Sequence, residues 1–260
     1  MCCIFGIGLF KDSTFRETEK LSRMIASLFL SGSVLGSHAS GLAIADRNKI
    51  GVLRRPLSPY ELCNSKEYEN FLHKYLHTKD NEPMIIFGHC RFPTKGSVKV
   101  HYNNHPIVTD DIVGIHNGEI INDNALFRIF SKDIKRIGTV DTEIIFRLIQ
   151  FFSTTAEDTE EDNKITYSIK RVSRLLSGSY ACGLLSAIAP ANLYLFRHIS
   201  PIYVHYLKSV SMIVFASRDD FVTSATFQIP GNSTRIEIPN NTGIVLNLEE
   251  KKAHAFRTYC

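Results

Sequence analysis

The cysteine at position 2 is the first residue of this sequence that could do chemistry. Removal of the initiator methionine would leave Cys2 with a thiol and a free α-amine a few bonds apart. An α-amine has an ordinary pKa of about 8, so it could act as general base for the thiol. The alternative is that Cys2 and Cys3 are two small apolar residues that open a buried strand. The sequence thus permits an N-terminal thiol nucleophile, and alternation along a strand would let only one of the two cysteines face a given pocket.

The segment GHCRFPTKG (88–96) follows a short apolar run and carries a second set of chemical groups. Arg91 presents a planar fork of donors that suits a carboxylate. Thr94 adds a hydroxyl, and Gly96 permits an unusual backbone conformation. The segment could therefore be a ligand-binding loop, or equally a surface turn with a solvated arginine.

Asn117 and Gly118 form a third candidate. A side-chain amide beside a glycine N–H is a compact donor pair that could hold an oxyanion. Asn-Gly is also the commonest signal for a type I′ hairpin turn. The following residues, 119–130, have a helical pattern instead of a partner strand, which favours the donor pair.

Asp141 lies where a helix is expected to begin, in TVDTE (139–143). Its carboxylate could simply favour the positive end of that helix, or it could receive a ligand's ammonium group. Several histidines and a cysteine lie close together in the sequence, which could indicate a metal site. No C-x-x-C pair accompanies them and His105 precedes a proline, so we expect no metal and no cofactor.

The elements that must position these residues alternate between strands and helices. Helices are expected at about 14–30, with Ser13 and Thr14 as caps, and at 62–76, 119–130, 139–152 and 165–176. Strands are expected at 2–10, 41–46, 49–55, 84–89, 111–116, 179–189, 193–198, 201–206, 212–217, 234–238, 243–248 and 254–259. The acidic stretch 156–163 is expected to be a solvated loop. This order predicts an α+β protein with sheets in the middle.

Composition restricts the class of protein. The chain has 260 residues with 44% hydrophobic and 22% charged residues, which is typical of one large globular domain over residues 1–260. The net charge of +4 comes from scattered residues and does not favour nucleic-acid binding. No apolar run is long enough to span a membrane, and no signal peptide is evident. The six cysteines show no paired spacing, so we expect reduced thiols in the cytoplasm.

Four elements in one order, an N-terminal Cys, GHCRFPTKG, HNGEIIN and VDTEII, resemble the glutaminase domain of class II glutamine amidotransferases. These are N-terminal-nucleophile hydrolases, and the similarity is greatest to the branch of glucosamine-6-phosphate synthase and amidophosphoribosyltransferase. It continues in SGSYACGLL (177–185) and FASRDDFV (215–222). The resemblance covers nearly the whole chain, and although each motif alone is weak, four motifs in this order and spacing are a strong signal.

The resemblance implies a four-layer αββα sandwich with two stacked antiparallel sheets. It also implies that glutamine is hydrolysed to glutamate and ammonia through a γ-glutamyl thioester on Cys2. Asn117 and Gly118 would hold the oxyanion. The α-carboxylate of glutamine would bind Arg91 and Thr94, with Phe92 as a lid, and the α-ammonium would bind Asp141.

The departures from the family pattern concern residues around that site. Cys3 stands where a glycine is usual, His38 replaces an aspartate, Phe92 replaces a Trp or Tyr, and Lys95 replaces a His or small polar residue. A synthetase or transferase segment is not evident, so we expect either that ammonia passes to a separate protein, which is favoured slightly, or that this protein hydrolyses a γ-glutamyl amide on its own. The alternative is a glutamine-sensing or scaffold module without turnover. The chain could also form a homo-oligomer.

Overall fold

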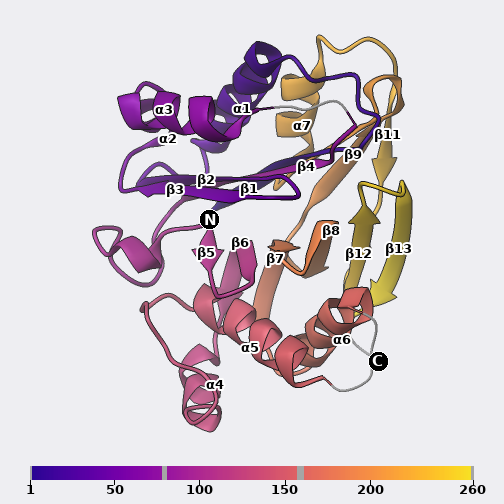
Figure 1. The fold of residues 1–260 in the computed structure, drawn as a ribbon. Coiled ribbons are helices and arrows are strands. Elements are labelled where there is room, and N and C mark those ends of the chain that lie inside the picture. Colours follow the sequence, from indigo (N-terminus) through magenta and orange to yellow (C-terminus); the bar gives the residue numbers. More distant parts are fainter. Residues whose placement is uncertain (1, 78–80, 157–160, 259–260) are drawn as a thin grey trace.

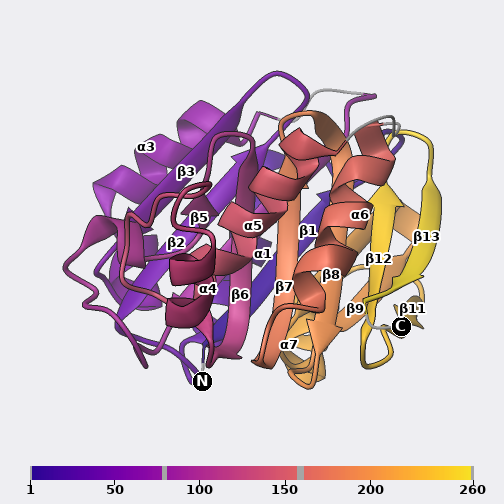
Figure 2. The same ribbon diagram turned by 90° about the horizontal axis from the view of Figure 1, so that it is seen from below.

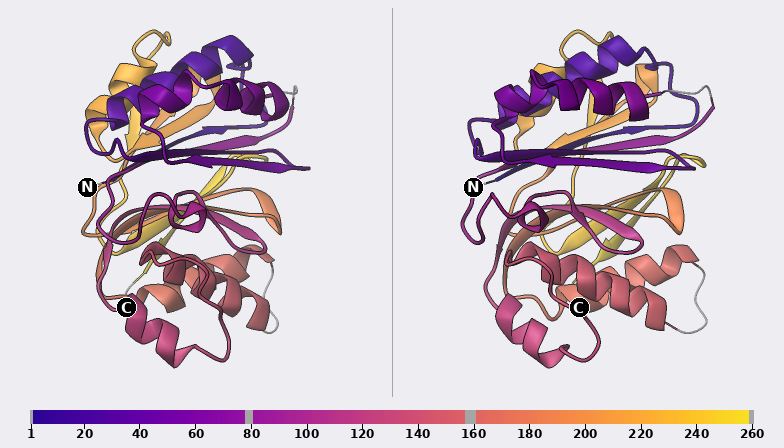
Figure 3. Two further views of the ribbon diagram at one scale, coloured as in Figure 1. Left: turned by 90° about the vertical axis from the view of Figure 1, so that its left-hand side faces the viewer. Right: turned by 60° about the vertical axis from the view of Figure 1, so that its left-hand side comes forward.

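Two stacked antiparallel sheets form the middle of the molecule, and helices cover the outer face of each (Figures 1 and 3). The structure is a computed structural model that describes residues 2–77, 81–156 and 161–258, with the backbone alone for 161–163. The α+β fold and the four-layer αββα arrangement predicted from the sequence are confirmed.

The first sheet has seven strands. In spatial order they are β11 (Ser233–Ile236), β9 (Tyr203–Leu207), β10 (Met212–Ala216), β1 (Cys3–Leu9), β4 (Met84–Arg91), β2 (Ala39–Ala45) and β3 (Ile50–Arg55). The helices over this sheet are α1 (Thr18–Gly32), α2 (Pro59–Cys63), α3 (Lys66–Tyr75) and α7 (Asp219–Thr226). The strand β1, which begins directly after Cys2, lies in the centre of the sheet between β10 and β4.

The second sheet has six strands. Their order is β13 (Lys252–Arg257), β12 (Thr242–Asn247), β8 (Ala189–His198), β7 (Gly178–Ser186), β6 (Ile112–Ile120) and β5 (Ile107–Val108). Its helical layer consists of α4 (Asp123–Ile129), α5 (Thr142–Thr155) and α6 (Glu161–Ser173). Figure 2, seen from that side, shows α5 and α6 lying over the sheet. Two short 3-10 helices, η1 (His101–Asn103) and η2 (Lys208–Val210), complete the elements.

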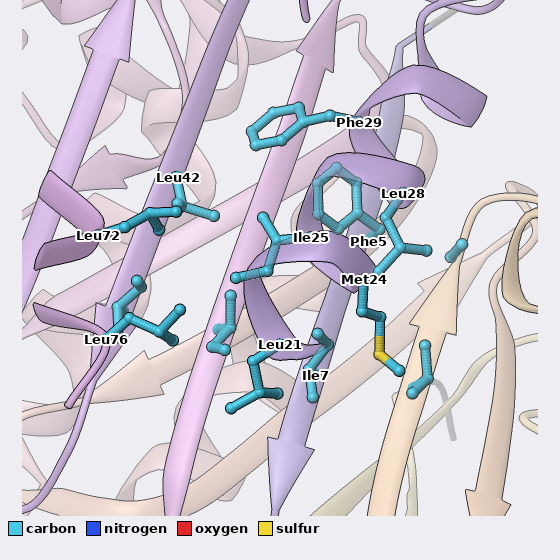
Figure 4. Close-up of a cluster of buried hydrophobic side chains, with 14 of the residues drawn as sticks. Phe5, Ile7, Leu21, Met24, Ile25, Leu28, Phe29, Leu42, Leu72 and Leu76 are labelled. Carbon is cyan, nitrogen blue, oxygen red and sulfur yellow. The ribbon is translucent and has the colours of Figure 1, made fainter. Parts of the chain in front are cut away.

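The helix α1 is fixed on β1 by an apolar stripe at helical spacing. Its buried members, which pack against side chains of β1, β2 and α3 (Figure 4), are Leu21, Met24, Ile25, Leu28 and Phe29. The ring of Phe29 meets that of Phe5 from β1 edge-on, with 4.9 Å between centroids. A second core lies between the two sheets and a third between the six-stranded sheet and α5 and α6. Burial on both faces makes β1 a rigid support for Cys2.

Gly32 at the end of α1 explains how Cys3 is accommodated. A Cβ at Gly32 would lie 2.8 Å from Sγ of Cys90 and 3.0 Å from Sγ of Cys3. Only glycine lets the helix end approach the two thiols this closely. Cys3 is fully buried on the α1 side of the sheet, so it does not crowd the inter-sheet side.

The start of α1 differs from the expectation. Ser13 and Thr14 do not cap it, because the helix begins at Thr18. The Ser13 hydroxyl instead donates to the carbonyl oxygen of Val210 at 2.8 Å, which ties the β1–α1 connection to the neighbouring hairpin. The Ser13 hydroxyl, which the local pattern predicted as a helix cap, therefore makes a tertiary hydrogen bond instead.

The helix expected at 62–76 is two helices, α2 and α3. Ser58 and Glu61 form a capping box at the start of α2, and Ser65 accepts from the N–H of Tyr68 at the start of α3. Two caps seven residues apart divide one apolar pattern into two elements. The short strand β5 and the helix α7 were not predicted.

The acidic stretch 156–163 was only partly tested. Residues 157–160 lie outside the described residues, whereas the backbone from Glu161 onward is already helical. The predicted loop is therefore too long at its C-terminal end. In the described parts of the chain, no helix has the length and apolarity needed to cross a membrane.

Candidate active site

The thiol of Cys2 contacts the loop that follows β4. Its Sγ lies 3.3 Å from the carbonyl oxygen of Phe92 and 3.4 Å from the Phe92 nitrogen, which donates to it. This contact follows from the pairing of β1 with β4, in which Cys3 faces Cys90. Continued by one residue, that register sets Cys2 opposite Arg91. The pairing of β1 with β4 therefore brings Cys2 next to the candidate ligand-binding segment 88–96.

Two charged groups from distant segments act on the Cys2 thiol. Burial raises the pKa of this thiol, the Arg91 guanidinium lowers it, and the Asp141 carboxylate raises it. A thiol with a raised pKa is a poor nucleophile without a nearby base, since the thiolate is the reactive form. A proton acceptor beside the sulfur, such as an unblocked α-amine at Cys2, would remove this obstacle.

Asn117 and Gly118 lie within β6 and are paired with Ala181 and Tyr180 of β7. The hairpin-turn interpretation of Asn-Gly is therefore wrong, and the expected strand end at 116 is four residues too early. Gly118 has a φ of 146°, and a Cβ there would lie 2.0 Å from the carbonyl oxygen of Ser179. The special backbone conformation is thus used inside a sheet, directly after Asn117.

Ser217 links Asn117 to β1 and so joins the two sheets at the site. Its Oγ accepts from the N–H of Ile4 at 3.0 Å and from Nδ2 of Asn117 at 3.3 Å. The Ser217 N–H donates in turn to the carbonyl oxygen of Ile4. Oδ1 of Asn117 is buried and has no hydrogen-bond partner among the described residues. Ser217 lies in the segment FASRDDFV (215–222), but a serine at a strand end has no local sequence signature that would predict this role.

Arg91 is a buried member of β4 with 3% of its surface exposed, so the interpretation as a solvated arginine in a surface turn is wrong. Its Nη1 donates to Oδ1 of Asn104 at 2.8 Å. Its Nη2 donates to the carbonyl oxygens of Lys95 and Gly96 at 2.7 and 2.8 Å. The guanidinium therefore organises the loop that follows it.

Phe92 and Thr94 lie on the exposed part of this loop. Phe92 is 45% exposed, and its ring meets the ring of His38 edge-on, with 5.1 Å between centroids. His38, the residue that replaces an aspartate, thus packs against the aromatic beside Cys2. Whether Thr94 contacts a ligand stays a prediction.

The Asp141 carboxylate bonds to the end of β6 and does not cap its own helix. Its Oδ2 accepts from the N–H of Ile120 at 2.7 Å, and no side-chain cap bond is made at the start of α5. Asp141 is 7% exposed. The bond holds the carboxylate at the N–H of Ile120, which follows Gly118 by two residues in β6.

Three histidines lie buried near the site, and burial lowers the pKa of each. They are His89, with a pKa lowered to about 3, His105 and His116. The rings of His89 and His105 stack with 4.0 Å between centroids. Nδ1 of His116 lies 2.7 Å from Oγ1 of Thr142, beside Asp141. Within the described residues, no three His, Cys, Asp or Glu side chains are arranged to hold a metal ion.

Comparison with known proteins shows that the sequence is similar to that of glutamine-dependent aminotransferases. The chain is 33% identical over 133 residues to glutamine–fructose-6-phosphate aminotransferase (isomerizing) of Staphylococcus aureus, covering 50% of this chain and 21% of that protein. The protein of the same description from Staphylococcus epidermidis is 31% identical over 135 residues, covering 51% and 21%. No protein-family model matches the chain.

Solved structures extend the similarity to the whole fold. Glutamine phosphoribosylpyrophosphate amidotransferase from B. subtilis superposes with a TM-score of 0.69 over 99% of this chain and 49% of that one, at 17% identity. A structure described as the allosteric regulatory enzyme of purine biosynthesis gives a TM-score of 0.70 over the same shares, at 16% identity. At such identity the structures support the fold alone. Together the comparisons confirm the resemblance to glutamine amidotransferases, although the chain spans only about a fifth of its sequence relatives and half of these structures.

Proposed function

We propose that this protein hydrolyses the side-chain amide of glutamine with Cys2 as nucleophile. The observation that carries the proposal is the convergence of a thiol, a cation, an anion and an amide donor from four separate segments. They are Cys2, Arg91, Asp141 and Asn117, joined through Phe92, Ile120 and Ser217. The aminotransferase names of the sequence relatives support glutamine as the substrate.

In the proposed reaction, Sγ of Cys2 attacks the amide carbon while the α-amine freed by removal of Met1 takes the thiol proton. The carbonyl oxygen becomes an oxyanion that accepts from Nδ2 of Asn117 and the N–H of Gly118. The protonated amine then gives its proton to the departing nitrogen. The carbon–nitrogen bond breaks, ammonia departs, and a γ-glutamyl thioester on Cys2 remains. Water attacks the thioester in the same way, which releases glutamate and restores the thiol.

Arg91 and Asp141 would bind the two charged groups at the other end of glutamine. Asp141 is nearly buried and supplies a fixed negative charge for the α-ammonium. Arg91 would act on the α-carboxylate, with Thr94 and Phe92 completing that side. Because Nη1 and Nη2 of Arg91 already hold Asn104 and the loop carbonyl oxygens, it would contribute mainly by charge and by the loop shape it enforces.

The ammonia is proposed to supply a synthetase or transferase, and the expectation that this acceptor is a separate protein stays a prediction. The names of the relatives, which describe amino transfer from glutamine to a sugar phosphate, support this use of the nitrogen. A single domain over residues 1–260, a cytoplasmic location, a homo-oligomeric assembly and a thioester intermediate stay predictions from the sequence.

The test combines intact-mass measurement with a glutamate-release assay. We expect mature protein to begin at Cys2, to release glutamate from glutamine, and to gain one adduct at Cys2 from a glutamine-like diazo ketone. Cys2→Ala should abolish both release and labelling. Cys63→Ala is the matched control, because Cys63 is another partly buried free thiol whose pKa burial raises to about 11.

The competing function is a glutamine-binding module without turnover. The raised pKa of the Cys2 thiol is the observation in its favour, since burial disfavours the thiolate. This module would bind glutamine in calorimetry and lose binding on Asp141→Asn, but would release no glutamate. Met1 retained on every molecule purified from the native source would refute the hydrolase.

A further inference from the structure

An ion pair anchors the loop beside Cys2 to α4, a helix in the layer that covers the six-stranded sheet. Nζ of Lys95 lies 2.7 and 2.6 Å from the two carboxylate oxygens of Asp123. Asp123 is the first residue of α4 and its side chain is only 1% exposed, whereas that of Lys95 is 37% exposed. A bidentate bond to a buried carboxylate defines the position of a long side chain better than a pair in open solvent does.

The backbone of the same residue is held from the other direction. Arg91 donates to the carbonyl oxygens of Lys95 and Gly96, so residue 95 is fixed through both its main chain and its side chain. Nδ2 of Asn103 donates to the carbonyl oxygen of Ser97 at 3.0 Å. The segment 92–94 thus runs from Cys2 to a doubly fixed point, while Phe92 and Thr94 between these points are exposed.

Asp123 has a second cation that makes no bond to this loop. Nη2 of Arg136 lies 3.1 Å from Oδ2 of Asp123, and its guanidinium stacks over the ring of Phe127 at 4.7 Å. Loss of the Lys95 ammonium would therefore leave the buried carboxylate paired. For this reason removal of Lys95 should act on the loop and leave the fold intact.

We propose that Lys95 is a positioning residue for glutamine, acting as a latch that keeps segment 92–97 in the conformation that binds the substrate. This inference rests on the proposed function. Without the latch the loop samples other conformations, and the apparent affinity falls in proportion to the fraction that remains competent. The chemical groups, Cys2 and Asn117, are untouched, so the chemical step keeps its rate.

The kinetic test compares Lys95→Met with Lys99→Met. Both remove one positive charge from the same segment, but Lys99 is exposed and only its backbone N–H has a described hydrogen bond. We expect Lys95→Met to raise the KM for glutamine about threefold to tenfold with kcat within about twofold, since a coupling of about 1 kcal/mol corresponds to a fivefold change in an equilibrium constant. Lys95→Arg should have a KM close to that of the wild type, and Lys99→Met should have the same KM as the wild type.

Salt and hydrogen exchange provide readouts that distinguish the latch from general damage. Raising NaCl should increase the KM of the wild type more than that of Lys95→Met, because salt screens the Lys95–Asp123 pair only where that pair exists. Amide exchange in 92–98 should be faster in Lys95→Met and unchanged in Lys99→Met. An unchanged KM, a fall in kcat at constant KM, or failure of Lys95→Arg to restore KM would overturn the inference.

The exchange experiment also separates this inference from the proposed function. If wild-type protein with a free Cys2 amine releases no glutamate, the hydrolase is refuted and the latch is judged by exchange alone. Faster exchange in Lys95→Met would then support the latch, and equal exchange would overturn it.

Discussion

Asn117→Ala should separate catalysis from stability, because its side chain is buried at the site yet poorly bonded within the fold. Asn117 is 2% exposed, its single described side-chain bond is the 3.3 Å contact of Nδ2 with Ser217, and Oδ1 has no partner among the described residues. Loss of one such bond costs about 0.5–1.5 kcal/mol of unfolding free energy. Ser217 keeps its bonds to Ile4, so no new buried group is left unpaired.

The catalytic cost should be much larger. Removal of one oxyanion donor costs about 2.7–4 kcal/mol, or a factor of about 10² to 10³ in kcat. Because the donor acts on charge that develops in the transition state, kcat and kcat/KM should fall together while KM stays constant. The assays are glutamate release across glutamine concentrations and urea unfolding of the same preparations.

Asn122→Ala is the matched control with the opposite expectation. Nδ2 of Asn122 donates to the carbonyl oxygen of Leu175 at 2.8 Å, and Oδ1 accepts from the N–H of Ser177 at 2.9 Å. Loss of both bonds should cost about 1–3 kcal/mol of stability and leave kcat unchanged. The reasoning is refuted if Asn117→Ala retains kcat within about fivefold of wild type, or if its activity falls only in step with its folded fraction.

Three further outcomes follow from buried groups and backbone geometry. Burial raises the pKa of the Cys2 thiol, so alkylation by iodoacetamide of protein that keeps Met1 should accelerate with pH beyond the ordinary cysteine pKa of about 8.5; a plateau below that value would contradict this. Burial also lowers the pKa of His105 well below its ordinary value, so unfolded chains bind more protons at pH 5 and stability falls with falling pH. His105→Gln removes this contribution, and urea unfolding should show that the wild type loses about 2 kcal/mol more than the variant between pH 7.5 and pH 5; parallel pH profiles would contradict this. Gly118→Ala would force a Cβ to 2.0 Å from the Ser179 carbonyl oxygen at a φ of 146°, so thermal and urea unfolding should show a loss of at least about 2 kcal/mol, and a change under about 0.5 kcal/mol would be inconsistent with this backbone.

Local pattern was sufficient for most of the helices and strands, whereas the catalytic and binding roles of the candidate residues stay predictions. Apolar runs predicted the central strands, and the apolar stripe from Leu21 to Leu28 predicted α1, because residues close together in the sequence determine these patterns. Local pattern gave the wrong structure where a residue bonds to a distant part of the chain instead of to its sequence neighbours. Ser13 bonds to Val210 instead of capping α1, and Asn117 and Gly118 continue in a strand because β7 lies beside them.

By itself the sequence determined which chemical groups this protein possesses and the order of the strands and helices that carry them. Only the tertiary structure decided that Cys2 touches Phe92, that Ser217 joins Ile4 to Asn117, and that Lys95 meets Asp123. Each of these contacts spans 28 or more residues of chain. Such contacts depend on strand register and on the stacking of two sheets, which short-range periodicity does not encode.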